Sequence, residues 1–151
     1  MQSTVVSSWN DFDPLKHAIV GRADFTCIPP SEPATEAKVP EDSDMRGMWG
    51  PRPLATVERA NAQLDNLVNL LESRGVRVDR PEPIQWNQAV NTPDFTTGSM
   101  FGCMPPRDVL LTVGKEILSA PMSFRCRYWE FLAYHTLMQR YFHEDPGFRW
   151  E

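Results

Sequence analysis

Residues 54–78, LATVERANAQLDNLVNLLESRGVRV, decide the fold of this chain. Apolar side chains recur there at steps of three and four residues, which places them on one face of a helix predicted over 54–74. Gly75 stands where a left-handed residue ends a helix, and residues 76–78 then alternate as a strand that Pro81 stops. A helix, a glycine and a strand in succession predict the α/β class. The apolar positions are Val57, Ala60, Leu64, Leu67, Val68 and Leu71.

Two segments precede this helix. Residues 16–21 contain the apolar run Ala18-Ile19-Val20 and close on a glycine, which predicts a short buried strand. Residues 23–53 are rich in Pro, Glu, Asp and Ser and have no sustained periodicity. We expect them to form an excursion loop over the surface.

Two further elements are predicted after a second loop at residues 81–92. Residues 109–113 and 116–118 flank Gly114 and Lys115, and a glycine at the first central position is what a type II′ hairpin needs. Ser123 can act as the N-cap of a last helix, predicted from Ser123 to Phe142. No closing element is expected after it. The apolar stripe of this helix is Phe124, Tyr128, Phe131, Leu132, His135, Met138 and Phe142.

The composition is that of a single soluble globular domain. The chain has 151 residues, of which 41% are hydrophobic, and this is enough for a sizeable core. A net charge of −5 without any basic stripe argues against nucleic acid as a partner. No apolar run approaches the length of a membrane span, and the first residues resemble neither a signal nor a transit peptide. We therefore expect no membrane contact and a cytoplasmic location.

The cysteines and histidines give no sign of a metal or a cofactor. Cys27, Cys103 and Cys126 are odd in number and have no CxxC spacing, which argues against a disulfide framework and a zinc site. We expect all three to be packed, inert thiols. His135 is expected in the core or at its boundary, and His143 near a helix end that favours positive charge.

The candidate binding residue is Asp94. Pro93 fixes its own backbone and biases Thr92 toward extended geometry, so the Asp94 carboxylate stands on a stiff backbone, as a recognition group would. The alternative is that Asp94 only caps or turns the chain, because Asx turns after proline are common. On residue types alone, the turn is the favoured interpretation.

Seven short stretches stand out in order along the chain: SWNDFDPL (8–15), IVG (19–21), GVRV (75–78), RP (80–81), TPDF (92–95), PRD (106–108) and APM (120–122). Together they resemble the N-terminal part of the glycine amidinotransferase family, including inosamine-phosphate and cyanotoxin-pathway amidinotransferases. Each motif is weak, while the ordered series is strong and covers nearly the whole chain. The poorest match is the loop at about residues 31–50.

This resemblance implies a pentein-like α/β propeller, in which ββαβ modules surround a central site with fivefold pseudosymmetry. Family members are more than twice as long, so residues 1–151 are expected to be the N-terminal part of a single amidinotransferase domain, with about two of five modules. The family moves the amidino group of L-arginine to an acceptor amine through a covalent amidino-cysteine. Its catalytic cysteine and histidine have no counterpart here, so the chain alone is expected to be inactive.

The resemblance carries one binding role over to this sequence. Asp94, in the TPDF match, corresponds to a carboxylate that contacts the guanidinium of the arginine donor, and a carboxylate can accept two hydrogen bonds from that planar fork. This reverses the order of the two interpretations of Asp94. Arg107 and Asp108 also match and are expected to pair and support the start of the next strand.

Three further arginines are expected to serve surface solvation and ion pairing: Arg125, Arg127 and Arg140.

Other functions remain open at this point. The chain could be a shortened, noncatalytic relative that binds a guanidino compound or a partner chain, with exposed apolar surface favouring a homo-oligomer. An arginine deiminase-like hydrolase ranks below the transferase because the motifs match amidinotransferases more closely. The acceptor amine is open among glycine, lysine, inosamine phosphate and pathway-specific amines. No cofactor is implied.

Overall fold

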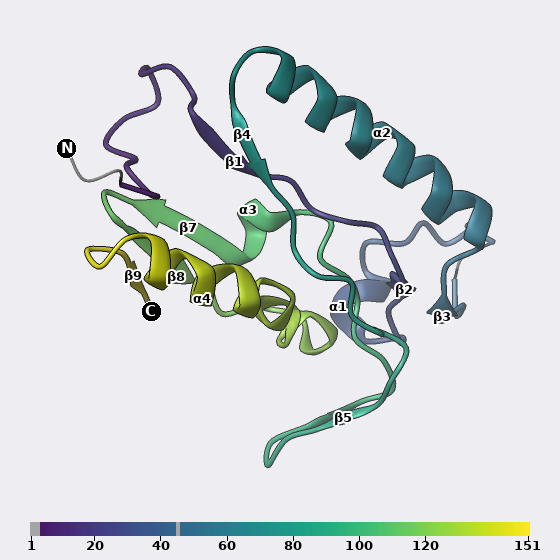
Figure 1. The fold of residues 1–151 in the computed structure, drawn as a ribbon. Coiled ribbons are helices and arrows are strands. Elements are labelled where there is room, and N and C mark those ends of the chain that lie inside the picture. Colours follow the sequence, from purple (N-terminus) through teal and green to yellow (C-terminus); the bar gives the residue numbers. More distant parts are fainter. Residues whose placement is uncertain (1–3, 45) are drawn as a thin grey trace.

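Two strand–helix–strand units organise the chain (Figure 1). In the computed structural model, which describes residues 4–44 and 46–151, β1 (His17–Ile19) pairs in parallel with β4 (Arg77–Asp79) across helix α2 (Leu54–Ser73). Strand β8 (Glu116–Ser119) pairs in parallel with β9 (Arg149–Trp150) across helix α4 (His135–Glu144). The other elements are β2 (Cys27–Ile28), α1 (Pro33–Glu36), β3 (Gly50–Pro51), β5 (Val90–Asn91), β6 (Thr96–Thr97), α3 (Pro106–Val109), β7 (Leu110–Val113), and the 3-10 helices η1 (Arg125–Arg127) and η2 (Glu130–Tyr134).

Helix α2 confirms the prediction made from its periodicity. It ends at Ser73, and Gly75 follows with a φ of +79°, the left-handed geometry expected of a residue that stops a helix. Its predicted apolar face is half-buried except at Leu67, which is 44% exposed. Leu54 and Leu70 are 71% and 51% exposed. The helix therefore covers β1 and β4 while leaving much of its own apolar surface open.

The segment before α2 matches its prediction in outline. Strand β1 lies within residues 16–21, but its three residues are half-buried, and burial is complete only at Val20 and Gly21. A Cβ atom on Gly21 would lie 2.0 Å from the carbonyl oxygen of Met104, so the close approach of two backbones requires glycine there. Residues 23–53 are largely irregular, and three short elements, β2, α1 and β3, interrupt the expected loop.

The predicted hairpin is confirmed. Strands β7 and β8 are antiparallel with Val113 opposite Glu116, so Gly114 and Lys115 form a two-residue turn. Gly114 has a φ of +58°, which the primed hairpin turns require at this position. A bridge from Ser8 to Gly114 brings the N-terminal segment to the tip of the hairpin.

The predicted helix from Ser123 to Phe142 is wrong in its extent and in its face. Two 3-10 helices occupy most of its first half, and α4 begins only at His135. Tyr128, Leu132 and Phe142 are 44%, 40% and 45% exposed, although they belong to the stripe expected to be buried. Met138 is buried as predicted, and the other buried side chains are Cys126, Glu130, Ala133, Tyr134, Leu137 and Tyr141. Together with Met138 they line the buried face. They also recur at helical spacing, but a buried glutamate interrupts their apolar character.

A closing element is present where none was expected. Strand β9 adds to β8 and completes the three-stranded sheet β7-β8-β9, with α4 beside it (Figure 1). Just before β9, the Asp145 carboxylate accepts a hydrogen bond of 3.1 Å from the Val5 backbone N–H. The two ends of the described chain are thus fastened together.

One hydrophobic core packs β7, β8 and α4 against the N-terminal and connecting segments, and Ile19 of β1 lies partly buried at its edge. No helix among the described residues is long and apolar enough to cross a bilayer. The buried cluster consists of Val5, Val6, Cys27, Trp86, Met100, Cys103, Val109, Leu110, Ile117, Ala133, Tyr134, Leu137, Met138, Tyr141 and Phe148.

Candidate functional site

Asp94 lies at the end of a hairpin that projects from the body of the chain. Strands β5 and β6 are antiparallel with Asn91 opposite Thr96, and the turn at Pro93 and Asp94 forms their tip (Figure 1). The Thr92 N–H donates to the Phe95 carbonyl at 2.9 Å and closes the turn. The stiff presentation expected from Pro93 therefore takes the form of a short two-stranded arm.

The side chain that stabilises this turn is Thr92 and not Asp94. The Thr92 hydroxyl oxygen accepts from the backbone N–H groups of Asp94 and Phe95 at 3.2 and 3.0 Å. The Asp94 carboxylate is exposed and has no hydrogen bond or ion pair with any described residue. An Asx turn made by Asp94 is thus the wrong interpretation, and the carboxylate is free for another partner.

Phe95 attaches the β5–β6 arm to the segment around η1, which follows β8. Its ring lies 5.7 Å from the Arg125 guanidinium and 5.8 Å from the Tyr128 ring, which it meets edge to face. Contacts of both kinds contribute about 0.5–1.5 kcal/mol each. The arm therefore carries its own fixed attachment immediately beside Asp94.

Arg107 and Asp108 do not pair with each other as expected. Both lie in α3, directly before β7, but the Asp108 carboxylate accepts a hydrogen bond of 3.1 Å from Nη1 of Arg127. Arg107 is exposed and forms no ion pair among the residues that the structure describes. Asp108 supports the start of β7 through Arg127 of η1, which is 19 residues away in the sequence.

Arg127 forms a buried ion pair with Glu130. Its Nε and Nη2 atoms donate to the two carboxylate oxygens of Glu130 at 2.9 and 2.8 Å, and Glu130 is fully buried. Burial raises the pKa of Glu130 to about 7, against the opposing effect of the Arg127 charge. The expectation that Arg127 serves surface solvation is wrong, while ion pairing is confirmed. The i,i+3 spacing of the two residues is the signal that could have identified the pair.

A second polar cluster, centred on Asp79, was not predicted from the sequence. Its Oδ2 atom accepts hydrogen bonds from His17 Nε2 at 2.7 Å and the Tyr141 hydroxyl at 2.8 Å, and forms an ion pair with Arg77 Nη2 at 3.1 Å. Arg140 donates to the other carboxylate oxygen. The second ring nitrogen of His17 faces the Val5 carbonyl oxygen at 3.0 Å. The cluster joins both ends of the described chain to β4.

Opposing effects act on the carboxylate at the centre of this cluster. Burial alone would raise the pKa of Asp79, but hydrogen bonds from His17, Tyr141 and Arg140, with the nearby Arg77 charge, hold it well below its usual range. Arg77 and Arg140 also bind Glu144, which completes an ion-pair network. Three donors and a further ion pair on one buried carboxylate indicate a structural role.

The cysteines are packed and unreactive, as expected. All three are buried and free of disulfides. Burial raises the pKa of the Cys103 and Cys126 thiols to about 12 and also raises that of Cys27. A thiolate nucleophile is therefore disfavoured at each position.

The histidines offer no metal site. Within the described part of the chain, no group of three His, Cys, Asp or Glu residues could hold a metal ion. His135 is exposed, with its ring 5.5 Å from that of Trp150, so its expected place in the core is wrong. His143 lies in the last turn of α4, where positive charge is favoured.

Comparison with known proteins gives a consistent family likeness. No family model matches the chain. The mitochondrial glycine amidinotransferase of Danio rerio is 39% identical over 148 residues, which are 96% of this chain and 34% of that protein. Among solved structures, an inosamine-phosphate amidinotransferase from Streptomyces griseus superposes with a TM-score of 0.85 and 32% identity, covering 99% of this chain and 43% of that one. An amidinotransferase of the saxitoxin biosynthetic pathway from Microseira wollei gives 0.81 and 34%, covering 96% and 40%.

These homologues confirm the resemblance read from the seven short stretches, including its restriction to the N-terminal part of the longer proteins. The chain spans about a third of the length of the curated relative and about two fifths of the two solved chains. The α/β class is confirmed in the coarse sense of a mixed fold without a closed sheet. The role of Asp94 stays a prediction.

Proposed function

We propose, from this homology, that the chain is the N-terminal part of an amidinotransferase that moves the amidino group of L-arginine to an acceptor amine. The observation that carries the proposal is the match over 96–99% of this chain to proteins named as amidinotransferases, at 32–39% identity. Their much greater length supports a catalytic cysteine and histidine beyond residue 151. In this proposal, residues 1–151 form one wall of the active site and do not turn over arginine alone.

The proposed role of Asp94 is to hold the guanidinium of the donor. A planar guanidinium offers paired N–H donors that a carboxylate can accept two at a time while balancing the charge. The exposed, unpartnered carboxylate on a braced hairpin tip supports this role, because no described residue competes for its oxygens. Phe95, held by Arg125 and Tyr128, supports a fixed position for the carboxylate.

Asp94→Asn in the complete gene product is expected to weaken donor binding by about 10- to 100-fold, because hydrogen bonds to a charged group contribute about 1.5–3 kcal/mol. The measurement is KM for L-arginine, with ornithine release followed across a panel of amines. Asp11→Asn, which changes an exposed carboxylate in the N-terminal segment, is the matched control. An unchanged KM in Asp94→Asn would remove the assignment. Absence of ornithine release with every amine would reject the transferase proposal itself.

The same proposal extends to the two strand–helix–strand units. We assign the two strand–helix–strand units to two modules of a fivefold α/β propeller. The parallel pairs β1–β4 and β8–β9, each formed across a helix, support this assignment. Exposed apolar side chains on α2 and β7 would then contact the neighbouring modules. They include Leu54, Leu70, Leu111 and Val113.

The isolated chain is accordingly expected to self-associate. Leu111 and Val113 are 56% and 53% exposed on one strand, and open apolar surface of this kind drives association. Static light scattering over a concentration series should give a mass that rises above that of the monomer. Leu54→Gln/Leu70→Gln should lower this tendency. A monomer that unfolds cooperatively at all concentrations would contradict the modular interpretation.

A noncatalytic relative that binds a partner chain is the second candidate, favoured by the same exposed surface. The gene sequence beyond codon 151 separates the two candidates, because the transferase requires the remaining modules. A deiminase-like hydrolase ranks lower, since the relatives described above are named as amidinotransferases.

We also propose a cytoplasmic location, which free thiols favour. Fractionation of cells that carry the tagged protein tests it.

A further inference from the structure

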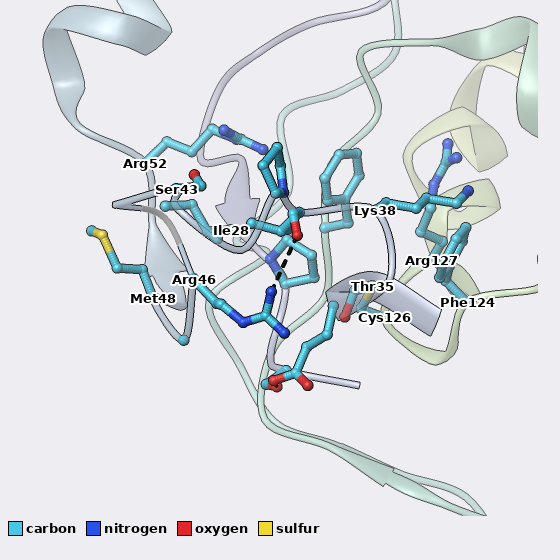
Figure 2. Close-up of a pocket in the computed structure, with 17 residues that line it drawn as sticks. Ile28, Thr35, Lys38, Ser43, Arg46, Met48, Arg52, Phe124, Cys126 and Arg127 are labelled. Carbon is cyan, nitrogen blue, oxygen red and sulfur yellow. Dashed lines mark hydrogen bonds between the residues drawn. The ribbon is translucent and has the colours of Figure 1, made fainter. Parts of the chain in front are cut away.

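A cavity of about 450 Å³ lies between the 23–53 segment and the segment around η1. Figure 2 shows Arg46 and Arg52 on one side of this cavity and Lys38 beside Phe124 and Arg127 on the other. Pockets that hold small molecules have volumes of about 300–1,000 Å³, so this one is large enough for a metabolite. Asp94 does not line it. The cavity is thus a feature separate from the proposed donor carboxylate.

Positive charge dominates the lining. Lys38, Arg46, Arg52 and Arg127 contribute four cations, while Glu36 contributes the single carboxylate. Glu36 already accepts a hydrogen bond from the Ser31 hydroxyl. The other acidic residues of the 23–53 segment do not line the cavity: Glu41, Asp42 and Asp44 are exposed, and Asp24 and Glu32 are half-buried.

Three of the four cations have no carboxylate partner among the residues that the structure describes. Arg127 is committed to Glu130 and Asp108. Among described residues, the Arg46 guanidinium donates to the Val39 carbonyl oxygen alone, at 3.4 Å, which leaves most of its N–H groups available (Figure 2). Lys38 and Arg52 form no ion pair with described residues. Three available cations around one cavity favour an anionic occupant.

Aromatic rings lie against Lys38, Arg52 and Arg127. The Phe101 ring lies 5.8 Å from the Arg52 guanidinium and 5.3 Å from that of Arg127. Lys38 Nζ lies 4.6 Å from the centre of the Phe124 ring. Cations placed in this way lose less freedom when they bind a ligand.

Most of the remaining wall is apolar, with Ser31, Thr35 and Ser43 as its uncharged polar residues. Such a surface would contact a hydrocarbon or aromatic body and would not contribute to binding a small inorganic ion. The apolar side chains are Ile28, Pro29, Val39, Pro40, Met48, Phe101 and Phe124.

We propose that this cavity binds a small organic anion, a carboxylate or a phosphate, whose charge is balanced by Lys38, Arg46 and Arg52 around the cavity and whose apolar body lies against the Phe101 and Phe124 rings. The site requires no amidino transfer and is independent of the proposed function. Arginine and guanidinium compounds do not fit it, because their cationic heads would face like charges.

Isothermal titration of the 151-residue chain with phenyl phosphate, phenylacetate, 2-phenylethanol and inorganic phosphate tests this site. The two organic anions are expected to bind at least about tenfold more tightly than the neutral alcohol, which lacks the charge-assisted hydrogen bonds, and than inorganic phosphate, which lacks the apolar body. The tighter of the two anions identifies the preferred head group. Equal affinity for the alcohol and the anions, or no binding of either anion at millimolar concentration, would overturn the proposal.

Charge-removing variants test whether the anions bind in this cavity. Arg46→Gln and Lys38→Gln, both at exposed positions, should each weaken binding of the anions by about 10-fold or more. Arg59→Gln on the exposed face of α2 is the matched control and should leave affinity unchanged. Thermal unfolding of each variant verifies that the fold is kept. Anion binding that neither cavity variant weakens would place the ligand elsewhere and reject the site.

Discussion

Replacing Asp79 with asparagine will lower the free energy of unfolding by about 3–5 kcal/mol at pH 7, the usual cost of removing one partner from a buried ion-pair network. The carboxylate accepts hydrogen bonds from His17, Tyr141 and Arg140 and forms an ion pair with Arg77. Asparagine keeps the shape, but its amide N–H₂ group would face donors. The measurement is urea-induced unfolding. Asp65→Asn is the control: Asp65 also pairs with an arginine, Arg80, but is 61% exposed, and the expected loss is below about 1 kcal/mol.

The pH dependence of this loss follows from the lowered pKa of Asp79. A carboxyl group whose pKa is lower in the folded chain than its ordinary 3.8 stabilises the fold above that pH, and the contribution is lost as the pH falls. The difference between wild type and Asp79→Asn should therefore be full at pH 7 and shrink below about pH 4. A difference that stays constant from pH 7 to pH 2 would mean that the charge of Asp79 does not stabilise the fold.

Arg127→Met will cost about 3–5 kcal/mol at pH 8, because it leaves the buried Glu130 carboxylate without its bidentate partner. The Arg127 side chain is 14% exposed, so water cannot replace the lost contacts. Arg149→Met is the control, since Arg149 pairs with Glu116 over 3.1 Å but is 70% exposed. Its cost should be below about 1 kcal/mol. The double variant Arg127→Met/Glu130→Gln should recover part of the stability, as expected of two coupled residues.

The raised pKa of Glu130 determines how the cost of Arg127→Met varies with pH. In the wild type, the folded chain holds a proton between pH 4.5 and about 7 that the unfolded chain has released, so Glu130 lowers stability as the pH rises through this window. Without Arg127, the proton is held to still higher pH. The cost of Arg127→Met should therefore fall from pH 8 to pH 5. An equal cost at both values would assign it to lost packing against Phe101 and not to the buried charge.

Patterns that extend over a few residues predicted the elements whose structure depends on close neighbours in the sequence. The 3.6-residue period of α2, Gly75 at its end and Gly114 in the β7–β8 turn each depend on neighbours within a few residues. The seven short stretches predicted the family because their order along the chain is itself information. What failed was the last helix. Glu130 stands in the buried stripe, and a charged residue there moved the predicted face to side chains that are exposed, such as Leu132.

The Asp79 cluster could not be predicted because its members are far apart in the sequence. His17 and Asp79 are 62 residues apart, and His17 and Tyr141 are 124 apart. No spacing rule connects such positions before the fold is known. Residue types alone favoured a turn role for Asp94, and its binding role, which stays a prediction, became the preferred interpretation only through the TPDF resemblance. The role of Thr92 in the turn depends on a hydroxyl geometry that residue types leave open.

The hydrogen bond from Val5 to Asp145 has a consequence for biosynthesis. Its two partners are 140 residues apart, so the N-terminal segment cannot reach its final place until almost all of these residues have been translated. At ribosomal speeds of about 5–20 residues per second, this segment waits roughly 7–28 s for its partner. During that interval its apolar residues, Val5 and Val6, are open to other contacts. A nascent chain of this kind is a natural client for chaperones that bind short hydrophobic segments.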